Sequence, residues 1–277
     1  MKTQSGFFAL TKYCLTILII TVGFLACKNS NTNSPEGSEI PQDEIIKGEA
    51  ILDLSGYPLP SSFYVTEMLN KAGAPFILSI ANSSENVGNY FSQKEKALNL
   101  GIYGADLSYA STYMMKQETM LYLKASNRLT DEMKISTAFN REYIDRIENN
   151  LDYGDSLILI ISDSFFDTYK YLVENNKDVS ALLVMAGSWI EGLYLTTQIA
   201  LTARDSIRFI EIIGQQKSSL TELLGLMEPV KSDTDLSEIY NSLKNLYNIY
   251  EPIQGNISDS QFNEIVDAIS NIRNGIV

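Results

Sequence analysis

Apolar residues recur at intervals of three and four along most of the chain, which is the spacing of one face of an α-helix. The longest stretch covers 178–202, where the spacing is kept by Val179, Leu182, Leu183, Ala186, Ile190, Leu193, Tyr194, Thr197 and Leu201. The segment 157–173 could in part be a strand by composition. Its length and the spacing of Phe166, Tyr169 and Leu172 favour a helix instead.

Prolines and capping residues indicate where these helices begin and end. No proline lies between positions 76 and 228, as expected for packed helices. The segment 92–124 predicts one long helix or two joined ones, and 235–250 and 259–274 predict amphipathic, peripheral helices. Helix starts are expected at Ser61, Thr130, Asn140 and Asp178, capping boxes at Ser232–Asp235 and Ser258–Gln261, and a helix end near Gly73.

The predicted fold class is all-α, a single multi-helix bundle domain over 49–277. No repeat period is present, which argues against an array of short repeats. Helices between 92 and 228 are apolar over much of their circumference and are expected in the middle of the bundle. The small residues Ala97, Gly101 and Ala105 recur every fourth position, which permits close approach of another helix.

The N-terminus has the features of an export signal. Two lysines precede an apolar, uncharged stretch over 13–26, which has the length of a signal-peptide core and is short for a membrane span. The stretch ends in Phe24-Leu25-Ala26-Cys27, which resembles the lipobox of bacterial lipoproteins. The resemblance implies a signal peptide over 1–26, cleavage before Cys27, and acylation of Cys27 by groups such as palmitate. A plain secretory signal or an N-terminal anchor helix is the alternative.

Residues 27–48 are expected to form a flexible tether, because they are polar, rich in Asn, Ser, Pro and Glu, and free of aromatic residues. The acylated Cys27 would attach the domain to a membrane through this tether. Lys28 follows the cysteine, where some lipoproteins retained in an inner membrane carry aspartate. By analogy with those lipoproteins, we expect the protein to be exported to the cell envelope and held at the outer membrane, facing the periplasm.

Composition excludes several classes of function. The chain has 34 acidic and 21 basic residues, a net charge of −13, which argues against nucleic acid as a partner. It has no histidine, which removes Ser-His-Asp and Cys-His catalysis and histidine-containing zinc sites. Of its two cysteines, Cys14 falls in the expected signal peptide, so no disulfide framework is expected.

Three acids stand out because their neighbours are apolar, and a carboxylate in such surroundings requires a partner or a site. They are Asp106, Asp163 and Glu191, and Glu191 follows Trp189, the only tryptophan of the chain. One hypothesis is that each acid accepts hydrogen bonds from Tyr, Ser or Arg across a helix interface. The other is a ligand-contacting groove formed by Trp189, Glu191, Asp106, Tyr109 and Asp163.

The sequence predicts neither a cofactor nor a metal site. A carboxylate cluster would suit Ca²⁺ or Mg²⁺, but no calcium-binding loop of the D-x-D-x-D-G kind is present. Paired carboxylates also serve glycosidases, whose clefts usually carry several aromatic platforms, and a single tryptophan gives this little support.

Three runs, GYPLPSSF, EKALNLGIYGADLSYAS and AGSWIEGLYLTTQ, make the chain after Cys27 similar to a group of exported helical lipoproteins without an assigned activity. The resemblance implies an envelope location only. We therefore expect a non-enzymatic binding or scaffolding module for an envelope protein partner or a small ligand. The alternative is a carboxylate-based enzyme acting on envelope glycans or peptides, and a structural spacer in a membrane complex is a third hypothesis.

Overall fold

The computed structural model describes residues 62–135, 141–203 and 207–277, and every regular element in them is a helix. The all-α prediction is therefore confirmed, and the described helices belong to one packed domain. The α-helices are α2 (Ser62–Lys71), α3 (Gln93–Thr112), α4 (Lys116–Glu132), α5 (Arg141–Asn149), α6 (Gly154–Glu174), α7 (Asp178–Thr202), α8 (Ile207–Met227), α9 (Ser237–Tyr250) and α10 (Asp259–Asn274). Short 3-10 turns are η1 (Leu78–Ile80), η2 (Ser84–Asn89) and η3 (Glu228–Val230).

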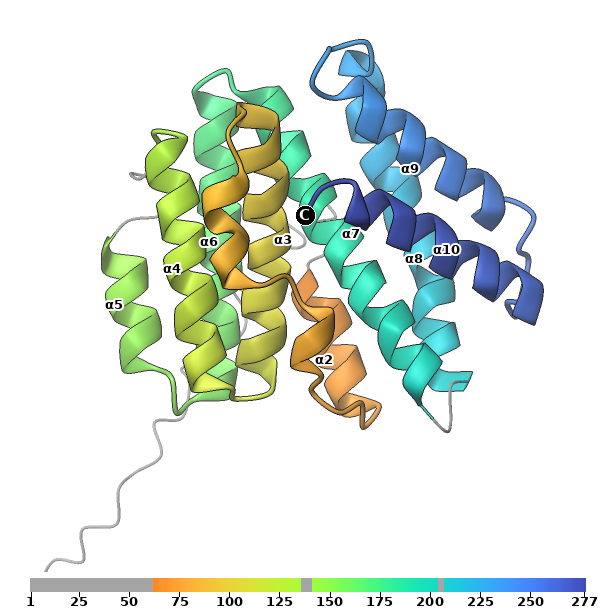
Figure 1. The fold of residues 1–277 in the computed structure, drawn as a ribbon, viewed down its shortest axis with the longest axis horizontal. Helices are drawn as coiled ribbons and strands as arrows, with labels where there is room; N and C mark the ends of the chain where they lie inside the picture. Colours follow the sequence, from red (N-terminus) through yellow and green to blue (C-terminus); the bar gives the residue numbers. More distant parts are fainter. Residues whose placement is uncertain (1–61, 136–140, 204–206) are drawn as a thin grey trace, which may run out of the picture. The chain divides into compact units, whose positions relative to one another are not determined.

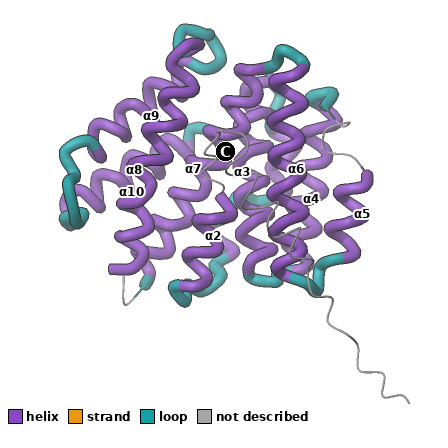
Figure 2. The backbone as a smooth tube through the Cα atoms, turned by 180° about the vertical axis from the view of Figure 1, so that it is seen from behind, coloured by secondary structure: helices purple, strands orange, loops and turns teal. Residues whose placement is uncertain are grey.

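Helices α3 and α7 form the centre of the domain. They pack most extensively against each other, and both also contact α2 and α6. Figure 1 shows α4, α5 and α6 on one side of this central pair and α8, α9 and α10 on the other, and the reverse view in Figure 2 agrees. Every residue from Ala97 to Ser111 of α3 is buried, which explains why its sequence has little amphipathic character.

Two glycines allow α3 and α7 to touch backbone to backbone. A Cβ atom at Gly101 would lie 1.9 Å from the carbonyl oxygen of Val184, and one at Gly187 would lie 2.0 Å from that of Leu98. No other residue fits at either position without moving a helix. The expectation that Gly101 permits close approach is thus confirmed, and the neighbouring small residues Ala97 and Ala105 are fully buried.

Helix boundaries match the sequence in part. The segment 92–124 holds parts of two helices, separated at Met114, whose φ of 57° is incompatible with a continuing helix. The capping box at Ser258 and Gln261 is confirmed, and α3 begins with a second one formed by Ser92 and Glu95. Helix α2 ends shortly before Gly73, as expected, and Gly73 takes a φ of 83°, which a continuing helix cannot have.

Two predicted helix starts are wrong. Thr130 lies inside α4 and caps no helix. Its hydroxyl donates a hydrogen bond to the carbonyl oxygen of Asn127 in the preceding turn. The capping box expected at Ser232–Asp235 does not form either: α9 begins at Ser237 after Leu236, which makes no side-chain cap, and Asp233 accepts a hydrogen bond from the backbone nitrogen of Asp235 in the preceding turn. The expected starts at Ser61 and Asn140 lie outside the described residues, as do the signal peptide, Cys27 and the tether.

Helix α7 is long and apolar enough to cross a membrane by length and composition, with a mean hydropathy of 1.4 over its most apolar window. However, 78% of that window is buried by the rest of the domain. A central helix of a packed fold requires the same apolar surface, so the hydropathy of α7 follows from its position in the bundle.

Candidate functional site

Glu191, the acid in the middle of α7, is paired. Its side chain is fully buried and accepts two hydrogen bonds from Arg273 near the end of α10, from Nε to Oε2 at 3.1 Å and from Nη2 to Oε1 at 3.2 Å. The guanidinium also lies over the ring of Tyr194, 4.6 Å from its centroid. This two-pronged geometry is the strongest that an arginine can offer a carboxylate, and it fixes the end of α10 on α7.

Asp106 of α3 is the second carboxyl group of this cluster. It is fully buried, and its Oδ2 accepts a hydrogen bond from the backbone nitrogen of Asn82 at 3.2 Å. Its Oδ1 accepts no hydrogen bond from any described residue. Burial and the nearby charge of Glu191 raise the pKa of Asp106 well above its ordinary value. These surroundings therefore favour the protonated form of Asp106 more than those of an exposed aspartate do.

The surroundings treat the two carboxyl groups differently. Arg273 donates to both oxygens of Glu191 and favours its ionised form, whereas Oδ1 of Asp106 accepts no hydrogen bond from any described residue and the charge of Glu191 favours the protonated form of Asp106. Burial raises the pKa of Glu191 too, but the adjacent Arg273 opposes the rise and favours the ionised form. With Asp106 protonated and Glu191 ionised, the three side chains would carry one positive and one negative charge, which lowers the cost of burying them.

A shell of amide side chains connects this cluster to the surface. The buried Asn82 donates from Nδ2 to the hydroxyl of Tyr90 at 3.0 Å and accepts at Oδ1 from Asn86 at 2.9 Å. Asn99, also buried, donates to the carbonyl oxygens of Glu95 at 3.0 Å and Ile276 at 3.1 Å. These bonds tie the irregular segment before α3, the first turns of α3 and the end of α10 into one unit.

The other predicted site residues lie elsewhere in the fold. Trp189 is 3% exposed and donates from Nε1 to Ser219 of α8 at 2.9 Å. The fully buried Tyr109 accepts from the backbone of Ile77 and donates to the carbonyl of Pro75, so its hydroxyl is satisfied within the core. Asp163 does not join Asp106 and Glu191, because its half-exposed side chain points toward Arg146 of α5, 4.0 Å away.

The sequence reasoning missed Arg273 and Asn82. A signal for Arg273 was present, since it continues the apolar face of its helix at four-residue spacing after Ile265 and Ile269, where a lone arginine requires a buried acid. Asn82 lies in an irregular segment before α3, where no periodicity reveals which side chains are buried.

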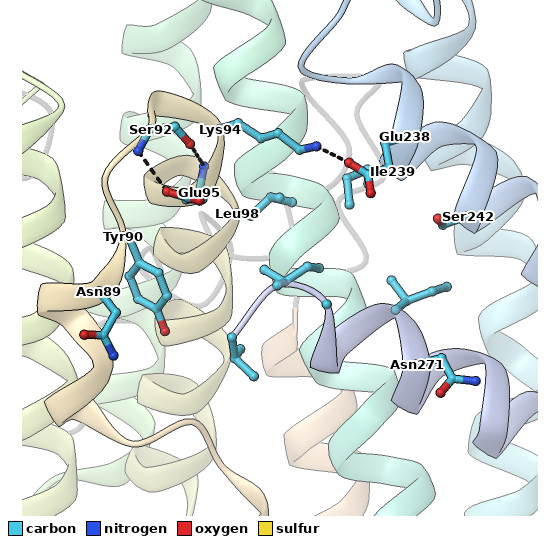
Figure 3. A pocket seen from close by; sticks show the side chains of 14 residues that line it. Asn89, Tyr90, Ser92, Lys94, Glu95, Leu98, Glu238, Ile239, Ser242 and Asn271 are labelled. Carbon is cyan, nitrogen blue, oxygen red and sulfur yellow. Dashed lines mark hydrogen bonds and ion pairs between the residues drawn. The ribbon is translucent and has the colours of Figure 1, made fainter.

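An open cleft of about 510 Å³ lies between the start of α3, the start of α9 and the end of α10. Figure 3 shows Lys94 of α3 joined to Glu238 of α9 across this cleft. Neither Asp106 nor Glu191 lines it, but Tyr90 and Ile276 take part in both the lining and the amide shell. The lining residues are Asn89, Tyr90, Ser92, Lys94, Glu95, Leu98, Glu238, Ile239, Ser242, Asn271, Ile272, Gly275, Ile276 and Val277.

Comparison with known proteins does not assign the site. No family model, no curated protein and no solved structure matches the chain. Within the described parts of the chain, no group of three or more Cys, Asp or Glu side chains is arranged to hold a metal ion. The similarity to exported helical lipoproteins stays a prediction.

Proposed function

We propose that the protein is a lipid-anchored cell-envelope protein whose helical domain binds a partner segment or a small polar ligand without catalysing a reaction. The observation that supports binding is the cleft between α3, α9 and α10. Its volume of about 510 Å³ is in the range of roughly 300–1,000 Å³ typical of ligand sites. Hydrogen-bonding side chains from several separate segments face it, and the hydrogen bond from Asn99 to the carbonyl oxygen of Ile276 joins two of these segments, α3 and the end of α10.

A substrate cannot reach the two buried carboxyl groups. Asp106 and Glu191 are both fully buried, and Glu191 has each oxygen committed to Arg273. A general acid must reach the proton acceptor of its substrate directly or through one water molecule. The raised pKa of Asp106 is explained by its burial and by the charge of Glu191, without a role in proton transfer to a substrate.

The carboxylates that do face the cleft are poorly suited to donating a proton. Hydrogen bonds from the backbone of Ser92 and Phe91 lower the pKa of Glu95, and the bond from Lys94 lowers that of Glu238. Both groups therefore stay ionised at neutral pH, whereas a pair of catalytic carboxyls needs one member protonated. This favours binding over the carboxylate-enzyme alternative.

The envelope location is a proposal from the N-terminal sequence. Acylation of Cys27 would hold the domain at a membrane, and residues 27–48 would separate it from the lipid surface. The outer membrane, with the domain facing the periplasm, is the location we favour on the basis of Lys28.

Site-specific crosslinking in cells tests the binding role. A photo-reactive amino acid at Ser242 or Asn271 places the probe in the cleft, and one at the exposed Glu148 of α5 serves as the matched control. We expect a discrete crosslinked product from both cleft positions and none from Glu148. Absence of a product from both cleft positions, or the same product from all three, would contradict binding in the cleft.

A further inference from the structure

We propose that the cleft selects a positively charged ligand, the lysine or arginine side chain of a peptide segment, over an anionic one. This inference deepens the proposed function and rests on it, because it assumes that the cleft is the binding site. It is carried by the charges that line the cleft, by the polarity of the helix ends there, and by the mixture of apolar and hydrogen-bonding surface.

The charged side chains of the lining are two acids and one base. Lys94 is held by Glu238, and the side chain of Glu238 remains 75% exposed, while that of Lys94 is 24% exposed. The base is thus the more covered member of the pair, and the acid is the more accessible. An incoming cation can contact Glu238 without displacing Lys94, whereas an incoming anion would have to compete with Glu238 for it.

The N-terminus of α3 also lies at the cleft, and such a terminus ordinarily attracts anions. Here it is already occupied by the chain itself. The Glu95 carboxylate accepts hydrogen bonds from the backbone nitrogens of Phe91 at 2.8 Å and Ser92 at 2.9 Å, and Ser92 caps the helix in return. Ser92 thus satisfies the backbone nitrogen of Glu95, and the negative charge of Glu95 offsets the positive end of the dipole and opposes an incoming anion.

The opposite polarity comes from α10, whose C-terminal end contributes Gly275, Ile276 and Val277 to the lining. The C-terminal end of a helix carries a partial negative charge and stabilises cations. Arg273 does not reverse this effect, because its charge is balanced by the buried Glu191. The local field and the net charge of −13 on the chain therefore have the same sign.

The surface of the cleft fits a long basic side chain on a peptide. Apolar contacts for an aliphatic stem come from Leu98, Ile239 and Ile272, and amide or hydroxyl groups for the peptide backbone come from Asn271 and Ser242. Between the lining residues Tyr90 and Ser92, the side chain of Phe91 is 80% exposed. An exposed aromatic ring beside such a site offers apolar and cation–π contact to the same kind of ligand.

Calorimetric titration of the full chain in detergent with capped peptides tests this inference. The probes are acetylated, amidated trilysine and triglutamate, which have the same length and opposite charge. We expect trilysine to bind about tenfold or more tightly than triglutamate, since like charges across an interface are strongly disfavoured. Glu238→Gln should weaken trilysine binding by about two- to fivefold, the range of an exposed ion pair.

The matched control is Glu264→Gln, which removes the same charge from an exposed position of α10 outside the cleft and should leave the affinity unchanged. Equal or tighter binding of triglutamate, failure of trilysine to bind, or equal effects of both substitutions would overturn the inference. The proposed function is judged separately by crosslinking at Ser242 and Asn271. A crosslinked product from both positions together with no trilysine binding would reject the cationic ligand and keep the cleft as a binding site.

Discussion

The raised pKa of Asp106 beside the Glu191–Arg273 pair predicts a specific pattern of stabilities in a double-mutant cycle, if Asp106 is the protonated carboxyl group. Glu191→Gln removes the partner of an arginine that is only 8% exposed, and breaking a buried pair costs about 3–5 kcal/mol. In this protein Asp106 can then lose its proton and supply the missing negative charge. We therefore expect the single substitution to cost about 2–3 kcal/mol, at or below the low end of that range.

The second single variant and the double variant complete the cycle. Asp106→Asn changes no net charge and keeps a donor toward Glu191, so it should cost less than about 1 kcal/mol. The double variant leaves Arg273 without any counter-charge and should exceed the sum of the two singles by about 1–2 kcal/mol.

Thermal and denaturant unfolding of the full chain measure these differences. For a domain of this size, each kcal/mol corresponds to a shift of roughly 2–4 °C in the unfolding midpoint. Additive effects, or a larger loss from Asp106→Asn than from Glu191→Gln, would refute the assignment of the proton to Asp106.

Three further outcomes follow from the same structure. Because the folded protein raises the pKa of Asp106, this group contributes most to stability below about pH 4 and loses its contribution as pH rises toward the folded pKa. The slope of this loss is at most about 1.4 kcal/mol per pH unit. Denaturant unfolding measured across pH should show this dependence in the wild type and not in Asp106→Asn. Gly187→Ala should lower the free energy of unfolding by about 1–3 kcal/mol because its Cβ would lie 2.0 Å from the Leu98 carbonyl, whereas Gly225→Ala, with nothing within 4 Å, should be neutral or stabilising by about 0.5–1 kcal/mol. Cys27→Ser should release the protein from the membrane fraction and remove the acyl mass, and an unchanged membrane-bound mass would reject the lipobox.

The helices were predictable from sequence wherever apolar spacing or capping residues determine them. Spacing alone was sufficient for α7 and for the terminal α9 and α10. The break between α3 and α4 was not, because Met114 takes a positive φ without being glycine or asparagine. At Thr130 the sequence predicts a helix start that the structure does not have. A threonine inside a helix can donate its hydroxyl to a carbonyl oxygen of the preceding turn, and its sequence then looks the same as that of a capping residue.

The candidate site divides in a similar way. Asp106 and Glu191 could be identified as buried acids because both lie in helices that are apolar around most of their circumference. Their convergence depends on how α3 and α7 cross, which the two glycines fix at backbone contact. The cleft was beyond prediction, because its lining comes from segments between Asn89 and Val277 that meet only in the folded domain.

The indole signal of the single tryptophan provides the most direct test of where binding occurs. Trp189 gives one Nε1–H resonance from the core beneath the surface, bonded to Ser219. On titration of isotopically labelled full chain with trilysine, we predict chemical-shift changes at Asn89, Ser242 and Asn271 and an unchanged Trp189 indole signal. A large shift of the indole signal with little change at the cleft residues would contradict the account and return the binding site to the buried neighbourhood of Trp189 and Glu191.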